Sequence, residues 1–322
     1  MLQNLILNQN AATMSFIDQS VLPTQNVVVR TGDVNRVAEA ICKLEIRGAP
    51  AIGVSAAMAV AMGLRNAGVS ELGELKKQTD RLCDYLASTR PTAVNLFWAL
   101  NKMREHGEKL YAQGLSCEDY LKGMEDEARR IAGEDISTNR AMAKYAASLI
   151  RDGEKIITIC NDGVLCSVAY GTAGGAFVTA AKEENKNIHI YACETRPLFQ
   201  GARLTAWELQ QEKIPYTVLT DSMAAYAFAN EQISMVMLGA DRIACNGDTA
   251  NKIGTYMLAV LANHFHVPFY VVAPSSTLDL TMKTGKEITI EQRDPDEVCV
   301  INGKRIAPEG APVLNPAFDV TP

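Results

Sequence analysis

The sequence predicts an α/β protein in which a mainly helical amino-terminal domain precedes a doubly wound parallel sheet. Two observations lead to this prediction. Between residues 155 and 273, short apolar runs alternate regularly with helical patterns, whereas helical patterns dominate before about residue 130. Regular strand–helix alternation is typical of a parallel sheet covered by helices on both faces. We therefore expect a helical domain over residues 1–130 and a sheet domain over residues 131–322.

Composition limits the classes of function. The chain has 322 residues, 48% of them hydrophobic and 21% charged, which is typical of a soluble globular protein. A net charge of −6 without a basic, aromatic-rich run argues against nucleic acid as a partner. The longest uncharged apolar run, residues 49–64, is shorter than the roughly 20 residues of a membrane span, so no membrane association is expected. Lacking a secretory pattern and any C-x-x-C pair, the chain is predicted to be cytoplasmic with reduced thiols.

In the helical part, arginine twice precedes a helix that begins with proline. A strand-like run and a helical pattern over residues 27–44 lead to Arg47 and Gly48, which stand before Ala49, Pro50 and a helix of small residues. Proline is favoured at the first helical position, and the unpaired N–H groups of a helix start can bind phosphate. Arg90 stands in the same way before Pro91. The alternative is that each arginine only caps or pairs with a neighbouring element.

The remaining elements follow in order. Residues 116–151 are predicted to be helical, with a break at Gly133 and the polar cluster 135–138. Strands are predicted at 155–160, 187–195, 216–221, 235–240 and 269–273, and helices at 165–182, 202–212, 222–228 and 250–264. The loop-rich tail from residue 277 is expected to pack over the sheet or a partner subunit. A dinucleotide site is not supported, because C-N-D-G rather than G-x-G-x-x-G follows the first strand.

Chemically capable side chains follow several predicted strands. Ligands of an open parallel sheet bind at the carboxyl ends of its strands, where Cys160 and Asp241 are expected. A thiol and a carboxylate facing each other could move protons, and semi-buried strand ends favour the shifted pKa values that this needs. Asn251 and Lys252, near the amino end of the helix predicted from residue 250, suit an anionic substrate. The alternative is that Asp241 only pairs with Arg242 and pins a loop.

A second polar stretch, residues 194–203, follows the strand at 187–195. Gln200 and Arg203 in it could reach sugar hydroxyls or phosphate. The alternative is a local pair between Glu194 and Arg196. Asp221, after the third predicted strand, is expected at the same edge of the sheet.

Together these segments resemble one known family. The motifs RGAPAIGVSAA, STRPTAVNL, ICNDG, ETRPLFQGARLTAWEL, GADRIACNGDTANKIGTYMLAVLA and NPAFDVTP, in this order, are similar to those of the methylthioribose-1-phosphate isomerases. That family shares a superfamily with regulatory subunits of a eukaryotic translation initiation factor. The resemblance runs from about residue 17 to the last residue.

The resemblance implies an enzyme of methionine salvage that isomerises a 5-substituted ribose 1-phosphate, its sugar-phosphate substrate, to the ribulose 1-phosphate. It implies a Rossmann-like second domain, a homodimer, and no metal or cofactor. The family's proton donor corresponds to Asp241, and the cysteine that stabilises the transition state corresponds to Cys160. The implied substrate contacts are Arg47, Gly48, Ala49, Arg90, Gln200, Asn251 and Lys252.

The sequence also departs from the family pattern. The loop after the cysteine is commonly C-N-A-G or C-N-T-G, but here Asp162 places an extra carboxylate beside the predicted site. The amino terminus is short and lacks the usual early tryptophan, so the 5-substituent is open between methylthio, deoxy and phosphate. We expect methylthioribose 1-phosphate. A non-catalytic regulatory subunit is the alternative of a different class, and the presence of Cys160, Asp241 and Lys252 argues against it.

Overall fold

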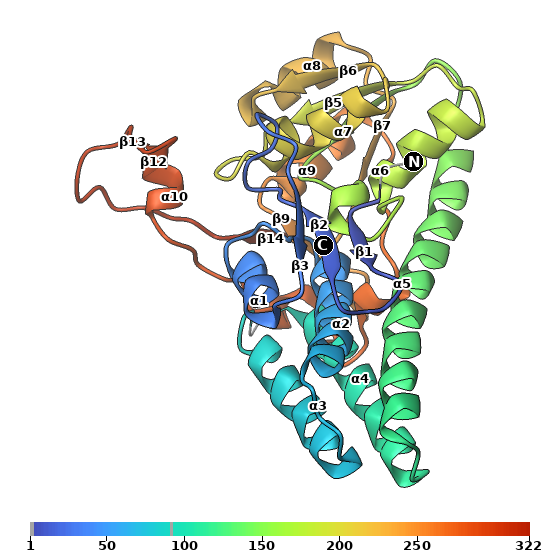
Figure 1. Ribbon diagram of the computed structural model, residues 1–322. Helices are drawn as coiled ribbons and strands as arrows, with labels where there is room; N and C mark the ends of the chain where they lie inside the picture. Colours follow the sequence, from blue (N-terminus) through green and yellow to red (C-terminus); the bar gives the residue numbers. More distant parts are fainter. Residues whose placement is uncertain (1–2, 91–92) are drawn as a thin grey trace. The chain divides into compact units, whose positions relative to one another are not determined.

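A computed structural model describes residues 3–90 and 93–322 of the chain, and it confirms the α/β class (Figure 1). The described residues form two compact units. The first runs to Ala141 and also includes Gly163–Gly171, and the second comprises Met142–Asp162 and Thr172–Pro322. The division into domains at residue 130 remains a prediction.

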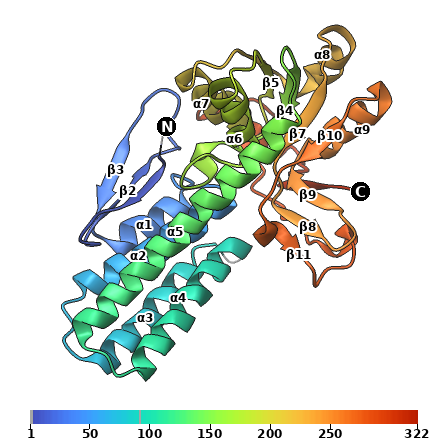
Figure 2. The same cartoon turned by 90° about the vertical axis from the view of Figure 1, so that its right-hand side faces the viewer.

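The first unit combines a small antiparallel sheet with helices. Its strands are β1 (Leu5–Leu7), β2 (Met14–Ile17) and β3 (Val28–Thr31), in the order β1-β2-β3. Its helices are α1 (Val34–Cys42), α2 (Ala49–Asn66), α3 (Leu72–Ala87), α4 (Val94–Ala112) and most of α5 (Cys117–Ser148). The strand-like run at residue 27 is confirmed by β3, whereas β1 and β2 were not predicted. Figure 2 shows α2, α3 and α4 side by side.

Helix α2 lies at the centre of this unit. It is buried almost all round, as its uninterrupted run of small and apolar residues predicts. Its small residues allow close packing, because a Cβ at Gly53 would lie 2.6 Å from the carbonyl oxygen of Asn95 in α4. The start of α2 is therefore held by the core of the first unit.

The predicted break in the long helix is wrong, because α5 is a single helix from Cys117 to Ser148. Gly133 lies on its exposed side, and apart from the neighbouring backbone of its own helix no atom of the described residues lies within 4 Å of a Cβ built there. Arg130 pairs with Glu134 across this point and with Glu127 in the turn before it. Such i,i+3 and i,i+4 pairs support a helix where glycine weakens it.

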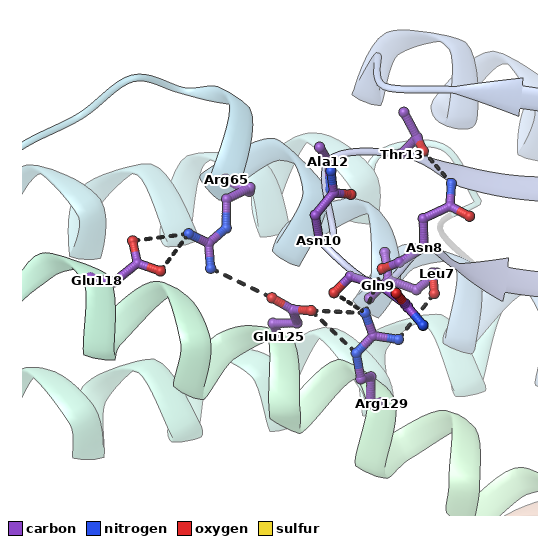
Figure 3. Close-up of polar contacts among 10 residues, drawn as sticks. All are labelled: Leu7, Asn8, Gln9, Asn10, Ala12, Thr13, Arg65, Glu118, Glu125 and Arg129. Carbon is purple, nitrogen blue, oxygen red and sulfur yellow. Dashed lines mark hydrogen bonds and ion pairs between the residues drawn. The ribbon is translucent and has the colours of Figure 1, made fainter.

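Arg129 of α5 ties the β1–β2 hairpin to the helices (Figure 3). Its guanidinium donates to the carbonyl oxygens of Leu7, Asn8 and Gln9 at the end of β1, at 3.0 Å for Leu7 and Gln9. The Glu125 carboxylate pairs with Arg129 at 2.8 Å and with Arg65 of α2 at 3.5 Å. Such multiple, charge-assisted contacts fix the position of the hairpin.

The second unit contains the predicted parallel sheet. Its strands are β4 (Lys155–Thr158), β5 (His189–Cys193), β6 (Tyr216–Leu219), β7 (Met235–Leu238) and β10 (Phe269–Val271), all parallel in the order β10-β7-β4-β5-β6. Each of the five strands was predicted from the sequence. Its helices are α6 (Ala173–Val178), α7 (Ala206–Gln211), α8 (Ala224–Asn230) and α9 (Thr255–Phe265), and π-helical turns at Thr179–Glu183 and Gly201–Thr205 extend α6 and precede α7.

Side chains of the sheet alternate between two apolar cores. Ile156, Ile190 and Met235 face one core, which α6 and α7 also line. Ile157, Tyr191 and Val236 face the other, beneath α8 and α9. Because successive side chains of a strand point to opposite faces, both faces of this sheet are covered. The doubly wound arrangement is confirmed.

Two predicted helices begin later than expected. The helix predicted from residue 165 begins at Ala173, because the chain from Gly163 to Gly171 joins the first unit as a loop with a short 3₁₀ turn, Val164–Cys166. The helix predicted from residue 250 begins at Thr255. The residues before it form a strand, β9.

Strand β9 (Thr249–Lys252) belongs to a second sheet, with β8 (Arg242–Ala244), β11 (Leu278–Asp279) and β14 (Phe318–Thr321), in the order β11-β8-β9-β14. All four residues of β9 are buried, and β8 and β14 pair with it on either side. The tail was expected to pack over the parallel sheet or a partner subunit, but its strand β14 instead joins this second sheet by pairing with β9. It also contains α10 (Asp296–Cys299) and the hairpin of β12 (Val300–Ile301) and β13 (Lys304–Arg305).

No helix in the part of the chain that the structure describes is long and apolar enough to cross a membrane.

Candidate active site

The strand order of the parallel sheet reverses between β4 and β7. From β4 the chain continues to β5 and β6 on one side, whereas β7 and β10 lie on the other. In such sheets the ligand binds in the crevice at the carboxyl ends of these two central strands. Cys160 follows the end of β4 by two residues, and Asp241 follows the end of β7 by three. The structure thus brings these two predicted residues to the same edge of the second unit.

The backbone of Cys160 is held on both sides by threonine hydroxyls. Its N–H donates to Thr195 Oγ1 at 2.8 Å, and its carbonyl oxygen accepts from Thr205 Oγ1 at 2.6 Å. The residue is buried and has a left-handed φ of 70°. Non-glycine residues in this conformation cluster at functional sites, where the surrounding structure enforces it. The position of the thiol is therefore fixed by contacts from the loop and helix that follow β5.

Asp241 lies in a different environment from the one expected. Its side chain is exposed, whereas the sequence predicted a semi-buried strand end with apolar surroundings. The reason is that β7 ends at Leu238 and the chain turns outward into β8. The main-chain N–H of Asp241 donates to the carbonyl oxygen of Ala250 at 3.0 Å, and Arg242 already pairs with β9.

Asn251 and Lys252 lie in strand β9, three to four residues before α9 rather than within its first turn. Lys252 is buried, donates from Nζ to the carbonyl oxygen of Ala317 at 2.9 Å, and lies over the Phe318 ring at 4.7 Å. Asn251 Nδ2 donates to Thr255 Oγ1 at 3.0 Å. The carboxyl-terminal tail therefore shapes the surroundings of this lysine.

Asp319, beside these residues in β14, caps the start of α9. Its carboxylate accepts the N–H groups of Gly254 at 2.8 Å and Tyr256 at 3.1 Å. Burial nevertheless raises the pKa of Asp319 above its usual value, against the lowering effects of these N–H groups and of Lys252.

Gln200 lies in the polar stretch after β5 and is buried, with 4% of its surface exposed. Within the described residues, its Oε1 atom has no hydrogen-bond partner. A buried acceptor without a donor calls for a physical explanation, and a ligand hydroxyl would supply the donor. This is the observation that most directly supports Gln200 as a binding residue.

The stretch that carries Gln200 is anchored to the end of β6. The carboxylate of Asp221 accepts the N–H groups of Thr195 at 2.9 Å and Arg196 at 2.7 Å. Burial, together with the Asp221 charge, raises the pKa of Glu194. The Arg196 guanidinium donates to the carbonyl oxygen of Val298 at 2.8 Å, so it does more than form the local pair considered from the sequence.

In the first unit, α2 begins at Ala49 with Gly48 as its N-cap and Pro50 in its first turn, which confirms the predicted helix start. Gly48 has φ 94°, and a Cβ there would lie 2.5 Å from Cys166 Cα. The start of α2 therefore packs directly on the loop Gly163–Gly171. Arg47 and Ala49 on either side are half-buried.

That loop is held by polar side chains of the first unit. Asn4 Nδ2 donates to the carbonyl oxygens of Leu165 at 2.9 Å and Ser167 at 3.1 Å. The carboxylate of Asp135 in α5 accepts the N–H of Val168 at 2.9 Å, and burial raises the pKa of Asp135 to about 6. Compact loops with closely spaced ends are frequently functional.

Arg90 is half-buried and precedes α4, which begins at Val94. Pro91 and Thr92, the predicted helix start, lie outside the described residues.

The predicted site residues are thus divided between the units. Cys160, Gln200, Asp241, Asn251 and Lys252 belong to the second, and Arg47, Gly48, Ala49 and Arg90 to the first. Sequence reasoning missed Thr205 and Phe318, because their contacts join segments distant in the chain. Within residues 3–90 and 93–322, no group of three or more His, Cys, Asp or Glu side chains is arranged to hold a metal ion.

The sequence matches that of a known family. The family model described as "Initiation factor 2 subunit family" matches residues 45–322, and the chain belongs to this family.

Similar proteins within this family carry the name of one kind of enzyme. The chain is 51% identical to the methylthioribose-1-phosphate isomerase of Thermotoga petrophila, over 96% of this chain and 88% of the relative. It is 47% identical to the enzyme of that name from Thermosipho africanus, over 99% of this chain and 91% of the relative. The resemblance to the methylthioribose-1-phosphate isomerase family is confirmed.

Two solved structures are similar over the whole chain. The 5-methylthioribose 1-phosphate isomerase of Pyrococcus horikoshii has a TM-score of 0.94 and 39% identity, covering 100% of this chain and 88% of that one. A protein described as translation initiation factor eIF-2B, subunit delta, from A. fulgidus has a TM-score of 0.91 and 40% identity, covering 100% and 92%.

Proposed function

We propose that this chain is an aldose–ketose isomerase that converts 5-methylthioribose 1-phosphate to 5-methylthioribulose 1-phosphate. The observation that carries the proposal is the pair of Cys160 and Asp241 at the ends of β4 and β7, where the strand order reverses. Nearly full-length relatives at 47–51% identity bear the name of this activity.

The chemistry of the substrate explains why an acid is needed. A sugar with phosphate on C1 is a glycosyl phosphate, which cannot open freely to an aldehyde. Protonation of the ring oxygen by Asp241 assists ring opening. Hydrogen then moves from C2 to C1, through an enolate or as a hydride, while Cys160 stabilises the transition state. No step requires a cofactor.

The other predicted residues bind the substrate. In the second unit, Lys252 supplies a buried positive charge for an anionic group. For Arg47, Gly48, Ala49 and Arg90 of the first unit, substrate contact is what the family resemblance implies, and a helix start such as that of α2 is suited to phosphate. The unpartnered Oε1 of Gln200 accepts a hydrogen bond from a sugar hydroxyl, and Asn251 completes the polar set.

Preference between the methylthio and the deoxy substrate depends on a small difference in binding free energy. One or two apolar atoms are worth about 1–3 kcal/mol in a pocket, so overlap with 5-deoxyribose 1-phosphate is expected. Ribose 1,5-bisphosphate differs by a charge and is expected to be a poorer substrate. Methylthioribose 1-phosphate places the enzyme in methionine salvage, acting in the cytoplasm as a homodimer, as the family resemblance implies.

A non-catalytic regulatory subunit is the second candidate. It is favoured by the similarity to the A. fulgidus protein described as an initiation-factor subunit. The thiol of Cys160 and the carboxylate of Asp241, both present at the strand ends, favour catalysis instead.

A coupled assay for ketose 1-phosphates distinguishes the two. Purified protein is offered methylthioribose 1-phosphate, 5-deoxyribose 1-phosphate and ribose 1,5-bisphosphate in parallel. We expect turnover, with the highest kcat/KM for methylthioribose 1-phosphate. If folded protein turns over none of the three sugars, the proposal of an enzyme is contradicted. The remaining candidate is then a regulatory subunit that binds a sugar phosphate.

A further inference from the structure

Asp162, in the loop after Cys160, joins the two central strand ends of the parallel sheet. Its Oδ2 accepts the N–H of Gly239, the residue after β7, at 2.9 Å. Its main-chain carbonyl oxygen accepts the N–H groups of Thr172 at 2.8 Å and Gly174 at 3.0 Å. We propose that Asp162 is a positioning residue that fixes the separation of the segments carrying Cys160 and Asp241. The proposal rests on the proposed function of the same site.

The need for such a contact follows from the pairing of the strands. The ladder between β4 and β7 consists of the pairs Ile156–Met235 and Ile157–Val236. Beyond it, Thr158 pairs with β5, and Leu238 pairs with β10. The two strands therefore diverge before Cys160 and Asp241, as expected where a ligand crevice opens between strand ends. The hydrogen bond from Gly239 to Asp162 spans this divergence.

Close packing at Gly239 shows how tightly the contact is made. A Cβ at this position would lie 2.8 Å from Asp162 Oδ1 and 3.2 Å from Thr172 Oγ1. The carboxylate thus rests directly on the backbone of residue 239. The hydrogen bond and this close packing together suit a contact that must hold two loops in register.

The consequence concerns the chemical step rather than binding. Asp162 lies two residues after Cys160, and Gly239 lies two before Asp241, so the hydrogen bond between them links the two segments that carry both groups. A displacement of about 1 Å between reacting groups can lower the rate about a hundredfold. Loss of the contact is therefore expected to reduce kcat more than it raises KM.

The test compares Asp162→Ala, Asp162→Asn and a matched control. Alanine removes the acceptor, and kcat is expected to fall by at least about tenfold with KM within about threefold. Asparagine keeps an oxygen that accepts from Gly239, so its kcat is expected to stay within about threefold of the wild type. The control is Asp152→Ala, because Asp152 accepts the N–H of Asn187 at 2.6 Å ahead of β4 and β5, the opposite edge of the sheet. Its kcat is expected to be unchanged.

Two further readouts keep the test decisive. Hydrogen exchange of the peptide spanning residues 235–241 should be faster in Asp162→Ala and unchanged in Asp152→Ala, whether or not the protein turns over a sugar phosphate. Gly239→Ala, which places a methyl against the same carboxylate, should lower kcat as Asp162→Ala does, and the double variant should be no worse than either single one. This variant and Asp162→Asn decide the outcome if Asp162→Ala does not fold.

The proposal is overturned if Asp162→Ala keeps its kcat, or if Asp162→Asn or Asp152→Ala is impaired as strongly as Asp162→Ala. Unchanged exchange at residues 235–241 overturns it as well. A wild-type protein without turnover contradicts the proposed function instead. The hydrogen-exchange measurement alone then tests whether Asp162 holds the segment 235–241 in place.

Discussion

The two units fix their predicted site residues by different physical means. In the first, the helix start at Gly48 is set by the backbone, through a left-handed glycine, a proline in the first turn and direct packing on Cys166. In the second, the position of Cys160 depends on the hydroxyls of Thr195 and Thr205, 35 and 45 residues away along the chain. The first kind of site is encoded locally, and the second exists only once distant segments have met.

The largest effect is expected from Gly48→Ala. Gly48 has φ 94° and ψ 134°, a conformation that costs a residue with a Cβ about 1–3 kcal/mol, and crowding by the Cα of Cys166 at 2.5 Å adds about 1–3 kcal/mol. Gly68→Ala is the control, because Gly68 also has a positive φ, 64°, and apart from its chain neighbours no atom of the described residues lies within 4 Å of a Cβ built there. Urea unfolding should show the greater loss for Gly48→Ala. Equal losses would show that the backbone conformation alone matters and that the contact with Cys166 does not.

Asp135→Asn tests the side-chain anchor of the loop that packs on Gly48. Burial raises the pKa of Asp135 from 3.8 to about 6, so the folded state binds the proton more tightly than the unfolded state. The tighter proton binding adds at most about 3 kcal/mol to the free energy of unfolding. This contribution is fully present below pH 4 and is lost as the pH rises through 6.

The asparagine variant lacks this titration. Its free energy of unfolding, measured by urea at pH 4 to 7, should therefore fall less with rising pH than that of the wild type. Parallel curves for the two proteins would show that Asp135 does not titrate in this range.

Thr195→Val tests the second kind of site. Valine has nearly the same shape but leaves the buried N–H of Cys160 without its acceptor, which costs about 1–3 kcal/mol. Thr179→Val is the matched control, because Thr179 is buried and its Oγ1 has no hydrogen-bond partner among the described residues. Thermal unfolding should separate the two variants. If Thr179→Val loses as much stability as Thr195→Val, the hydrogen bond from the Cys160 N–H to the Thr195 hydroxyl does not contribute measurably to stability.

The same contrast explains what the sequence could predict. Strands β4 to β7 and β10 and the helix start at Ala49 were predictable, because apolar runs and proline position act locally. The continuity of α5 past Gly133 was missed, since the charged pairs of Arg130 beside and across it support the helix at one exposed glycine. Strand β9 was missed although β8 lies next to it in the sequence, because its second partner, β14, lies at the far end of the chain.

The candidate site divides in the same way. The types of its residues could be predicted from the sequence, and their environments could not. Lys252 lies against Phe318, and Asp241 is exposed, because β9 pairs with the tail and β7 turns outward into β8. The contact from Asp162 to Gly239 likewise depends on which strands are neighbours in the sheet.

The most direct test of the central claim separates binding from turnover in Cys160→Ser and Asp241→Asn. Calorimetry with 5-methylthioribose 1-phosphate should give Kd values within about tenfold of the wild type, because both residues are assigned to the transition state and not to ground-state binding. Proton NMR of the same mixtures should show ketose formation by the wild type and a loss of at least about a hundredfold in both variants. Wild-type rates in either variant, with binding intact, would contradict the assignment of the thiol and the carboxylate to the reaction.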